Sequence, residues 1–170
     1  ALNVPLHVLL GGKFRDNLRT YASQLQFGWG ESLQPALTPE DYAKNSLKAV
    51  EEGYDCVKID FFTFDKEGNT FSEEQRNGIL KPDFVDLVEE RVAAVREAIG
   101  PKIDIIMENH SFLDAQSAVQ IGRRVEKYNI FCYEEPTTPT PKVTKFVADR
   151  IQIPIASGER IYTRWQYAPY

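Results

Sequence analysis

The sequence predicts an α/β fold in which about five parallel strands alternate with four crossover helices. Short apolar runs and longer amphipathic stretches follow one another along nearly the whole chain, which is typical of βαβ units. The chain has 170 residues, enough for one domain with a substantial core. A complete eight-stranded barrel takes about 250 residues, so five units indicate either an open five-stranded sheet or part of a barrel.

Local signals place the individual elements. Thr38 is the expected N-cap of the first helix, where Pro39 and Asp41 complete a capping signal. A long helix is expected at 82–99, because apolar residues recur there at three-and-four spacing and Gly100 ends the pattern. The expected strands are 18–23, 57–61, 103–107, 130–133 and 153–156, and the expected helices are 38–52, 82–99, 114–128 and 141–150.

The segment 63–81 interrupts this alternation. It is polar, contains two glycines and has no sustained period. A loop of this length after a strand is either a functional lid or a tolerated surface insertion, and the sequence favours neither.

Composition narrows the class of protein. The hydrophobic fraction is 42% and the charged fraction 26%, as in a globular protein and unlike a disordered or membrane-spanning one. The net charge of −5 does not suit a protein that follows a phosphate backbone, so we expect no nucleic-acid partner. Cys56 and Cys132 lie in apolar runs, which favours buried reduced thiols and a cytoplasmic protein.

Three of the expected strands run into carboxylates, Glu108, Glu134 and Glu159, which are 26 and 25 residues apart. The carboxyl ends of neighbouring parallel strands face one crevice or barrel mouth. Three carboxylates there would repel one another unless a cation neutralised them, and hard oxygen ligands suit Mg²⁺. The alternative is that each carboxylate caps a helix or faces solvent.

Lys58, Asp60 and His110 are further candidates. Lys58 and Asp60 are two residues apart on an expected strand and therefore point to the same face. Lys58 either acts on a carboxylate-bearing substrate or forms a structural salt bridge. His110 lies two residues after Glu108, so it is expected beside a metal ligand, in a catalytic or a structural role.

These motifs resemble the enolase superfamily, specifically its mandelate racemase-like subgroup of acid-sugar dehydratases similar to galactonate dehydratase. The resemblance covers nearly the whole chain and keeps its order and spacing. It is carried by LLGGKFRDNLRTYAS, GYDCVKIDFF, IDIIMENHSFLDAQSA, IFCYEEPTTP and IPIASGERIYTRW.

The resemblance implies strands one to five of a (β/α)₈, TIM-like barrel. It makes Glu108, Glu134 and Glu159 the Mg²⁺ ligands, with Glu134 rather than Glu135 as the second. His110 matches the histidine that acts as the acid for a departing hydroxyl, and Lys58 matches the first lysine of the second-strand motif.

Two departures from the family pattern favour a dehydratase. The first ligand is usually Asp, whereas Glu108 is a methylene longer, and Asp60 stands where racemases carry their second lysine. The implied reaction removes the α-proton of a sugar acid through a metal-stabilised enediolate and then eliminates the β-hydroxyl, giving a 2-keto-3-deoxy acid. In the family the base is usually a histidine on a later strand, and no histidine follows His110 in this sequence.

The resemblance also sets the expected domain organisation. Residues 1–16 are expected to be a linker and helix remnant that follows a missing N-terminal capping domain, and 17–170 a partial barrel domain. The complete enzyme is expected to be a homo-oligomer that acts on a small carboxylate, with no membrane partner. The 170-residue piece alone is expected to be inactive.

The sequence leaves two other functions open. One is a racemase or epimerase of the same superfamily. The other is a non-catalytic, magnesium-binding α/β module whose acidic crevice binds the cation without chemistry.

Overall fold

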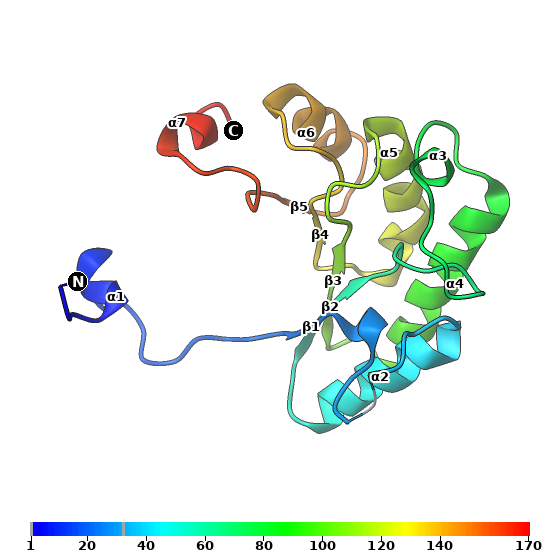
Figure 1. Ribbon diagram of the computed structural model, residues 1–170, viewed down its shortest axis with the longest axis horizontal. Helices are drawn as coiled ribbons and strands as arrows, with labels where there is room; N and C mark the ends of the chain where they lie inside the picture. Colours follow the sequence, from blue (N-terminus) through cyan, green and yellow to red (C-terminus); the bar gives the residue numbers. More distant parts are fainter. Residues whose placement is uncertain (1, 32) are drawn as a thin grey trace.

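A single parallel sheet forms the centre of the molecule. The computed structural model describes residues 2–31 and 33–170, and its strands are ordered β1-β2-β3-β4-β5 (Figure 1). The strands are β1 (Ala22–Ser23), β2 (Cys56–Asp60), β3 (Asp104–Glu108), β4 (Cys132–Glu134) and β5 (Ile155–Ala156). The helices are α1 (Leu6–Leu9), η1 (Leu25–Phe27), α2 (Pro39–Glu51), α3 (Glu73–Arg76), α4 (Pro82–Ile99), α5 (Ala115–Val125), η2 (Glu126–Tyr128), α6 (Pro141–Ala148) and α7 (Arg164–Tyr167).

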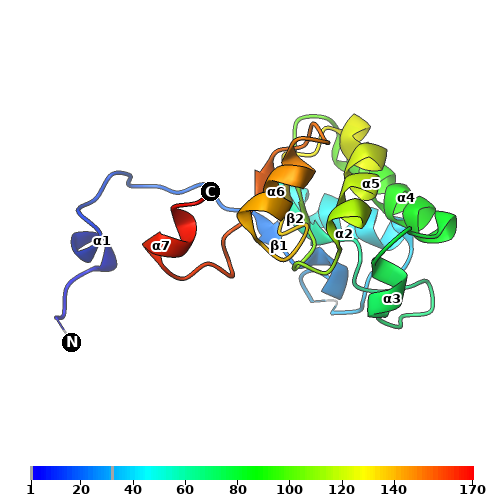
Figure 2. The same ribbon diagram turned by 90° about the horizontal axis from the view of Figure 1, so that it is seen from above.

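The winding of the chain is that of a barrel segment. Each strand pairs in parallel with the next one in sequence, and α2, α4, α5 and α6 all cover the same face of the sheet (Figures 1 and 2). A doubly wound sheet reverses its strand order and carries helices on both faces. The structure therefore favours the partial-barrel expectation over an open, doubly wound module.

The expected elements are confirmed, with shifts at their ends. Thr38 caps α2 in a reciprocal capping box with Asp41, and α4 begins and ends where Pro82 and Gly100 predict. The first strand is shorter than the expected 18–23, because only Ala22 and Ser23 pair with β2. Strand ends depend on long-range pairing, which local sequence does not encode.

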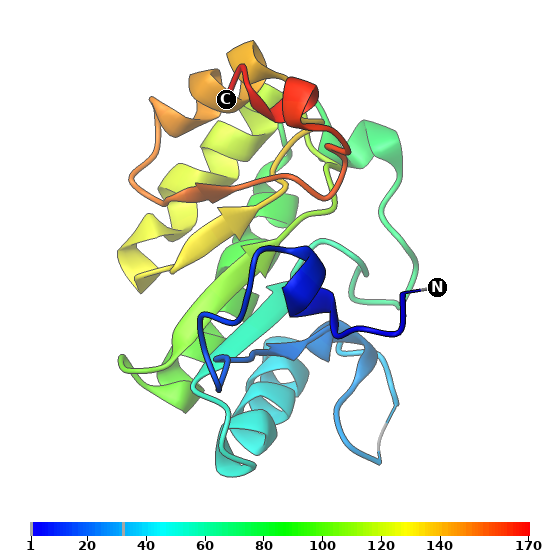
Figure 3. The same cartoon turned by 90° about the vertical axis from the view of Figure 1, so that its left-hand side faces the viewer.

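Alternation along the strands separates the core from the opposite face. Val57 and Ile59 of β2 are fully buried on the face that the helices cover. Lys58 and Asp60 belong to the other face, which is viewed in Figure 3. The apolar core therefore fixes which face of each strand is left for polar side chains.

Arg91 ties the helical layer to the rim of the sheet. Its guanidinium is fully buried and donates hydrogen bonds of 2.7–2.9 Å to the carbonyl oxygens of Leu37, Phe61 and Phe64. Two of these carbonyls follow β2 and the third precedes α2. One side chain on α4 thus satisfies backbone groups that would otherwise be buried without a donor.

The segment 63–81 packs against the helices and is not an unstructured loop. It contains α3, capped reciprocally by Ser72 and Gln75, which its polar composition had not predicted. Phe71 packs edge-on against Phe84 of α4, with ring centroids 4.7 Å apart. Ser117 of α5 donates a 2.9 Å hydrogen bond to the carbonyl oxygen of Gly78.

The two ends of the chain lie apart from the sheet. Residues 2–21 are exposed except for half-buried Gly12, and α1 and α7 extend from the face opposite the helices (Figures 1 and 2). Within the described residues, no helix combines the length and apolarity needed to cross a membrane. Cys56 and Cys132 are free thiols; Cys56 is buried as expected, whereas Cys132 is only half-buried.

We expect Arg91→Met to lower the free energy of unfolding by about 3 kcal/mol or more, because three buried carbonyls would lose their donor. Urea denaturation measures the change. The matched control is Arg123→Met on the exposed surface of α5, where a change of less than about 1 kcal/mol is expected. Equal effects of the two substitutions would contradict the role given to Arg91.

Candidate active site

Three carboxylates form one row across the carboxyl ends of three neighbouring strands. In the register of the sheet, Asp60 of β2 lies beside Glu108 of β3, and Glu108 lies beside Glu134 of β4. Adjacent strands are about 4.8 Å apart, so the three side chains share one face at close spacing. Parallel pairing therefore brings together residues that are up to 74 positions apart in the sequence.

Lys58 compensates two of these charges. Its Nζ donates to Glu108 Oε1 at 2.9 Å and to Glu134 Oε1 at 2.8 Å, and only 10% of the lysine side chain is exposed. Burial lowers the pKa of Lys58, but the hydrogen bonds with Glu134 and Glu108 outweigh burial and raise it above its usual range. Lys58 is therefore a fixed positive charge in this arrangement, and the salt-bridge interpretation holds with partners on β3 and β4.

His110 compensates the third carboxylate. Its Nδ1 lies 2.8 Å from Asp60 Oδ2, and its Nε2 lies 3.5 Å from Glu108 Oε1. The hydrogen bond with Asp60 raises the pKa of His110 above its ordinary value and prevails over the opposing effect of burial. Asp60 is 1% exposed, and its other oxygen accepts from the Phe62 backbone N–H at 2.7 Å. Asp60 therefore orients the imidazole so that Nε2 faces Glu108.

Gln24 is a member of the site that sequence reasoning missed. Its Nε2 donates to Glu108 Oε2 at 3.0 Å, while its Oε1 accepts from Gln26 at 2.7 Å. Gln24 adopts a left-handed backbone conformation with φ of 65° just after β1. No local motif marks this position, because the contact joins residues 84 apart in the sequence.

Glu159 stands apart from Glu108 but shares a cavity with Glu134. The cavity, of about 250 Å³, is lined by both of these glutamates and by the loop after β5. Glu159 is 41% exposed at its side chain, and its Oε1 lies 3.7 Å from Arg160 Nε. Across residues 2–31 and 33–170, no three His, Cys, Asp or Glu side chains converge closely enough to hold a metal ion.

The donor set nevertheless suits a hard divalent cation. Glu108 and Glu134 present carboxylate oxygens side by side, and Glu159 follows the next strand into the same cavity as Glu134. Lys58, His110 and Arg160 supply at most three positive charges against these three carboxylates and Asp60. An uncompensated negative charge at the strand ends attracts a cation.

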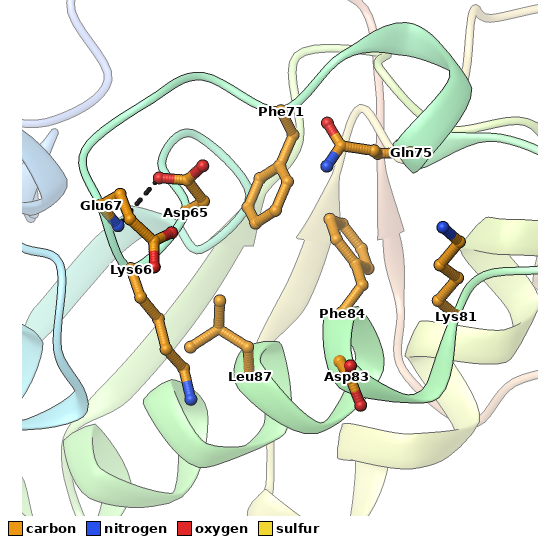
Figure 4. A pocket seen from close by; sticks show the side chains of 9 residues that line it. All are labelled: Asp65, Lys66, Glu67, Phe71, Gln75, Lys81, Asp83, Phe84 and Leu87. Carbon is orange, nitrogen blue, oxygen red and sulfur yellow. Dashed lines mark hydrogen bonds between the residues drawn. The ribbon is translucent and has the colours of Figure 1, made fainter.

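A second cavity, of about 400 Å³, lies between the segment 63–81 and α4 (Figure 4). Its floor is formed by Phe71, Phe84 and Leu87, and Lys66 and Lys81 flank it. None of the residues that line it belongs to the row of carboxylates. The candidate site is therefore at the strand ends and not in this cavity.

The segment 63–81 approaches the candidate site through α3. The guanidinium carbon of Arg76 lies 4.2 Å from the centre of the Phe112 ring, and that ring lies 5.7 Å from the imidazole of His110. The segment therefore forms part of the rim beside the histidine.

The sequence is similar to known proteins over most of its length. Residues 41–170 match the family described as enolase C-terminal domain-like. The chain is 31% identical over 172 residues to D-gluconate/D-galactonate dehydratase of Picrophilus torridus, covering 99% of this chain and 39% of that protein. It is 38% identical over 135 residues to D-gluconate dehydratase of Thermoproteus tenax, covering 79% of this chain and 24% of that protein.

The fold has a close match among solved structures. A member of the enolase superfamily from Salmonella Typhimurium superposes with a TM-score of 0.93 and 50% identity, covering 98% of this chain and 43% of that one. The chain thus spans less than half the length of these relatives. Both the sequence motifs and the singly wound parallel sheet agree with these matches, and the chain belongs to the enolase superfamily.

Proposed function

We propose that this chain carries part of the active site of a sugar acid dehydratase, a carbon–oxygen hydro-lyase that converts an aldonic or related acid to a 2-keto-3-deoxy acid. The single observation that carries the proposal is the pairing of His110 with buried Asp60 directly beside Glu108. The names of the relatives support it, since two of them are dehydratases of gluconate or galactonate.

His110 has the properties that a general acid needs. Asp60 raises the pKa of His110 above its ordinary value, which favours the protonated imidazole that a general acid needs. Because Asp60 takes the Nδ1 side, the proton available to a substrate is on Nε2, whose side chain is 30% exposed. We infer that His110 donates this proton to the β-hydroxyl as the C–O bond breaks and water leaves.

Lys58 has the properties of an electrostatic residue rather than a base. Two carboxylates hold its ammonium and keep its pKa above the usual range, so it does not release a proton near neutral pH. We infer that it attracts the substrate carboxylate to the strand ends. The racemase alternative needs a lysine base on β2, and Asp60 stands two residues after Lys58 on that face.

Glu108, Glu134 and Glu159 are the residues that would hold Mg²⁺. When bound, the cation would supply positive charge to the substrate carboxylate and make the α-proton more acidic. The row of Asp60, Glu108 and Glu134 supports this role through its excess of negative charge. The non-catalytic magnesium module shares this donor set, but it does not need the Asp60–His110 pair.

Replacing the acid and its partner separates their roles. We expect His110→Asn to lower kcat by about 10²-fold to 10⁴-fold, the usual contribution of a general acid. We expect Asp60→Asn to lower the pKa of His110, because the hydrogen bond to a charged partner is what raises it. The acid works only below its own pKa, so the alkaline limb of the kcat profile should move to lower pH in Asp60→Asn.

The measurement is the pH–rate profile of the complete enzyme with aldonic and aldaric acids as substrates and MgCl₂ in the buffer. Glu97→Gln, on the exposed side of α4, is the control and should leave the profile in place. An alkaline limb unmoved by Asp60→Asn would contradict the assignment of His110. Exchange of the α-proton with solvent deuterium without loss of water would favour the racemase instead.

Removal of a ligand tests the cation site without turnover. We expect Glu134→Gln to weaken Mg²⁺ binding at least tenfold, since even outer-shell partners of a metal contribute about 10-fold to 100-fold in affinity. Isothermal titration with MgCl₂ alone measures the affinity, again with Glu97→Gln as the control. Unchanged affinity in Glu134→Gln would mean that the cation binds elsewhere.

The 170-residue chain by itself should show no dehydratase turnover, because no histidine follows His110 in it to serve as the base that the family uses. A coupled assay for 2-keto acids on the purified piece measures this. Release of a 2-keto acid from the isolated piece would show that a residue within it removes the α-proton.

A further inference from the structure

Glu135, which follows the candidate ligand Glu134, has an unusual setting. Its side chain is 1% exposed, and its backbone φ of 45° lies in the left-handed region that non-glycine residues rarely adopt. Such a conformation persists only where surrounding contacts hold it. The contacts of the Glu135 carboxylate therefore indicate its role.

One oxygen of Glu135 holds the loop after β5. Its Oε1 accepts hydrogen bonds from Ser157 Oγ at 3.1 Å, from Gly158 N at 2.5 Å and from Glu159 N at 3.1 Å. Glu135 N also donates to the Ala156 carbonyl oxygen at 2.8 Å. Four contacts thus join Glu135 to the backbone and side chains that present Glu159.

The other oxygen holds the loop after β3. Ser111 Oγ donates to Glu135 Oε2 at 3.1 Å, and Ser111 N donates to the Glu135 carbonyl oxygen at 2.8 Å. His110 and Ser111 both have positive φ, at 50° and 65°, so this turn also needs outside support. Arg160 adds to it by donating from Nη2 to the His110 carbonyl oxygen at 3.0 Å and from Nε to Ser111 Oγ at 3.2 Å.

We propose that Glu135 is a positioning residue that holds the loops after β3, β4 and β5 in one arrangement, and thereby sets where His110, Glu134 and Glu159 lie relative to one another. The proposal rests on the proposed function for the roles of those three residues. Glu135 does not contact substrate, because its two oxygens are occupied by four donors from the neighbouring loops.

The chemistry of the four donors predicts that shape matters more than charge at this position. All four are neutral hydroxyl or backbone N–H groups, and three of them donate to Oε1, which an amide oxygen can replace as acceptor. Ser111 Oγ can accept from an amide N–H in place of donating to Oε2. Glu135→Gln should therefore preserve the network, whereas Glu135→Ala leaves these part-buried donors without their common acceptor.

The test compares Glu135→Ala with Glu135→Gln in the complete enzyme. Misplacement of reacting groups by about 1 Å costs on the order of 10²-fold in rate, so Glu135→Ala should lower kcat about 100-fold with little change in KM. Mg²⁺ affinity, measured by titration with MgCl₂ alone, should fall about 10-fold to 100-fold. Glu135→Gln should lose only a few-fold in each.

Amide hydrogen exchange supplies a readout that does not depend on turnover. In Glu135→Ala the amides of Gly158 and Glu159 should exchange faster, while those of β2 and β3 keep their protection. Ser157→Ala removes a single donor and keeps the test open if Glu135→Ala does not fold. It should speed exchange at Gly158 and weaken Mg²⁺ binding less than Glu135→Ala would.

Two results would overturn the proposal. One is a folded Glu135→Ala protein, or Ser157→Ala where the former does not fold, with unchanged exchange at Gly158 and Glu159 and unchanged Mg²⁺ affinity. The other is a Glu135→Gln protein as impaired as Glu135→Ala, which would show that the charge of Glu135 is what matters. If the unaltered protein dehydrates no sugar acid, the proposed function fails, but the exchange comparison still decides the role of Glu135.

Discussion

The row of carboxylates at the strand ends is the constraint to which the rest of the site responds. Asp60, Glu108 and Glu134 lie side by side because the parallel register pairs Asp60 with Glu108 and Glu108 with Glu134. At strand spacing their mutual repulsion would be several kcal/mol in a poorly hydrated setting. Lys58 lies between the second and third, and His110 between the first and second. Lys58 and His110 therefore alternate with the carboxylates, and these contacts raise the pKa of both groups.

The hydrogen bonds around this row show why the rim of the sheet is well defined. Arg91 collects carbonyl groups around the end of β2, and Glu135 collects donors from the loops after β3 and β5. Each is a buried charged side chain whose partners are mainly neutral backbone groups. Loops at the ends of strands would otherwise carry unsatisfied polar groups. By pairing with these groups, Arg91 and Glu135 hold the loops at the rim in a fixed arrangement.

The sequence predicts the architecture well and the site in part. Helix α4 is placed correctly at both ends because Pro82 and Gly100 are local signals. The shared face of Lys58 and Asp60, and the row that Asp60 forms with Glu108 and Glu134, follow from period-two alternation and strand order, which a sequence does reveal. The contact of His110 with Asp60 does not, because His110 follows β3 with a left-handed backbone at φ of 50°. Glu159 does not lie in the row with Glu108 and Glu134, because the β5 residue in register with Glu134 is Ala156. Glu159 comes three residues later, after Gly158 at φ of 143°. Gln24 and Glu135 could not be predicted, since both act through left-handed backbone and partners far away in the sequence.

The pairing of Asp60 with His110 also bears on where the α-proton goes. A base on β2 would have to be Lys58 or Asp60, since these are the charged residues on that face of the strand. Lys58 is held protonated by two glutamates, and Asp60 is 1% exposed with both oxygens engaged, one by Phe62 N and one by His110. Neither is free to take a proton from carbon. Under the proposed function, Lys58 would attract a carboxylate and His110 would donate a proton, so the step that removes the α-proton would require a group other than Lys58 and Asp60. That division of tasks fits the proposed dehydratase better than a racemase whose base is on β2.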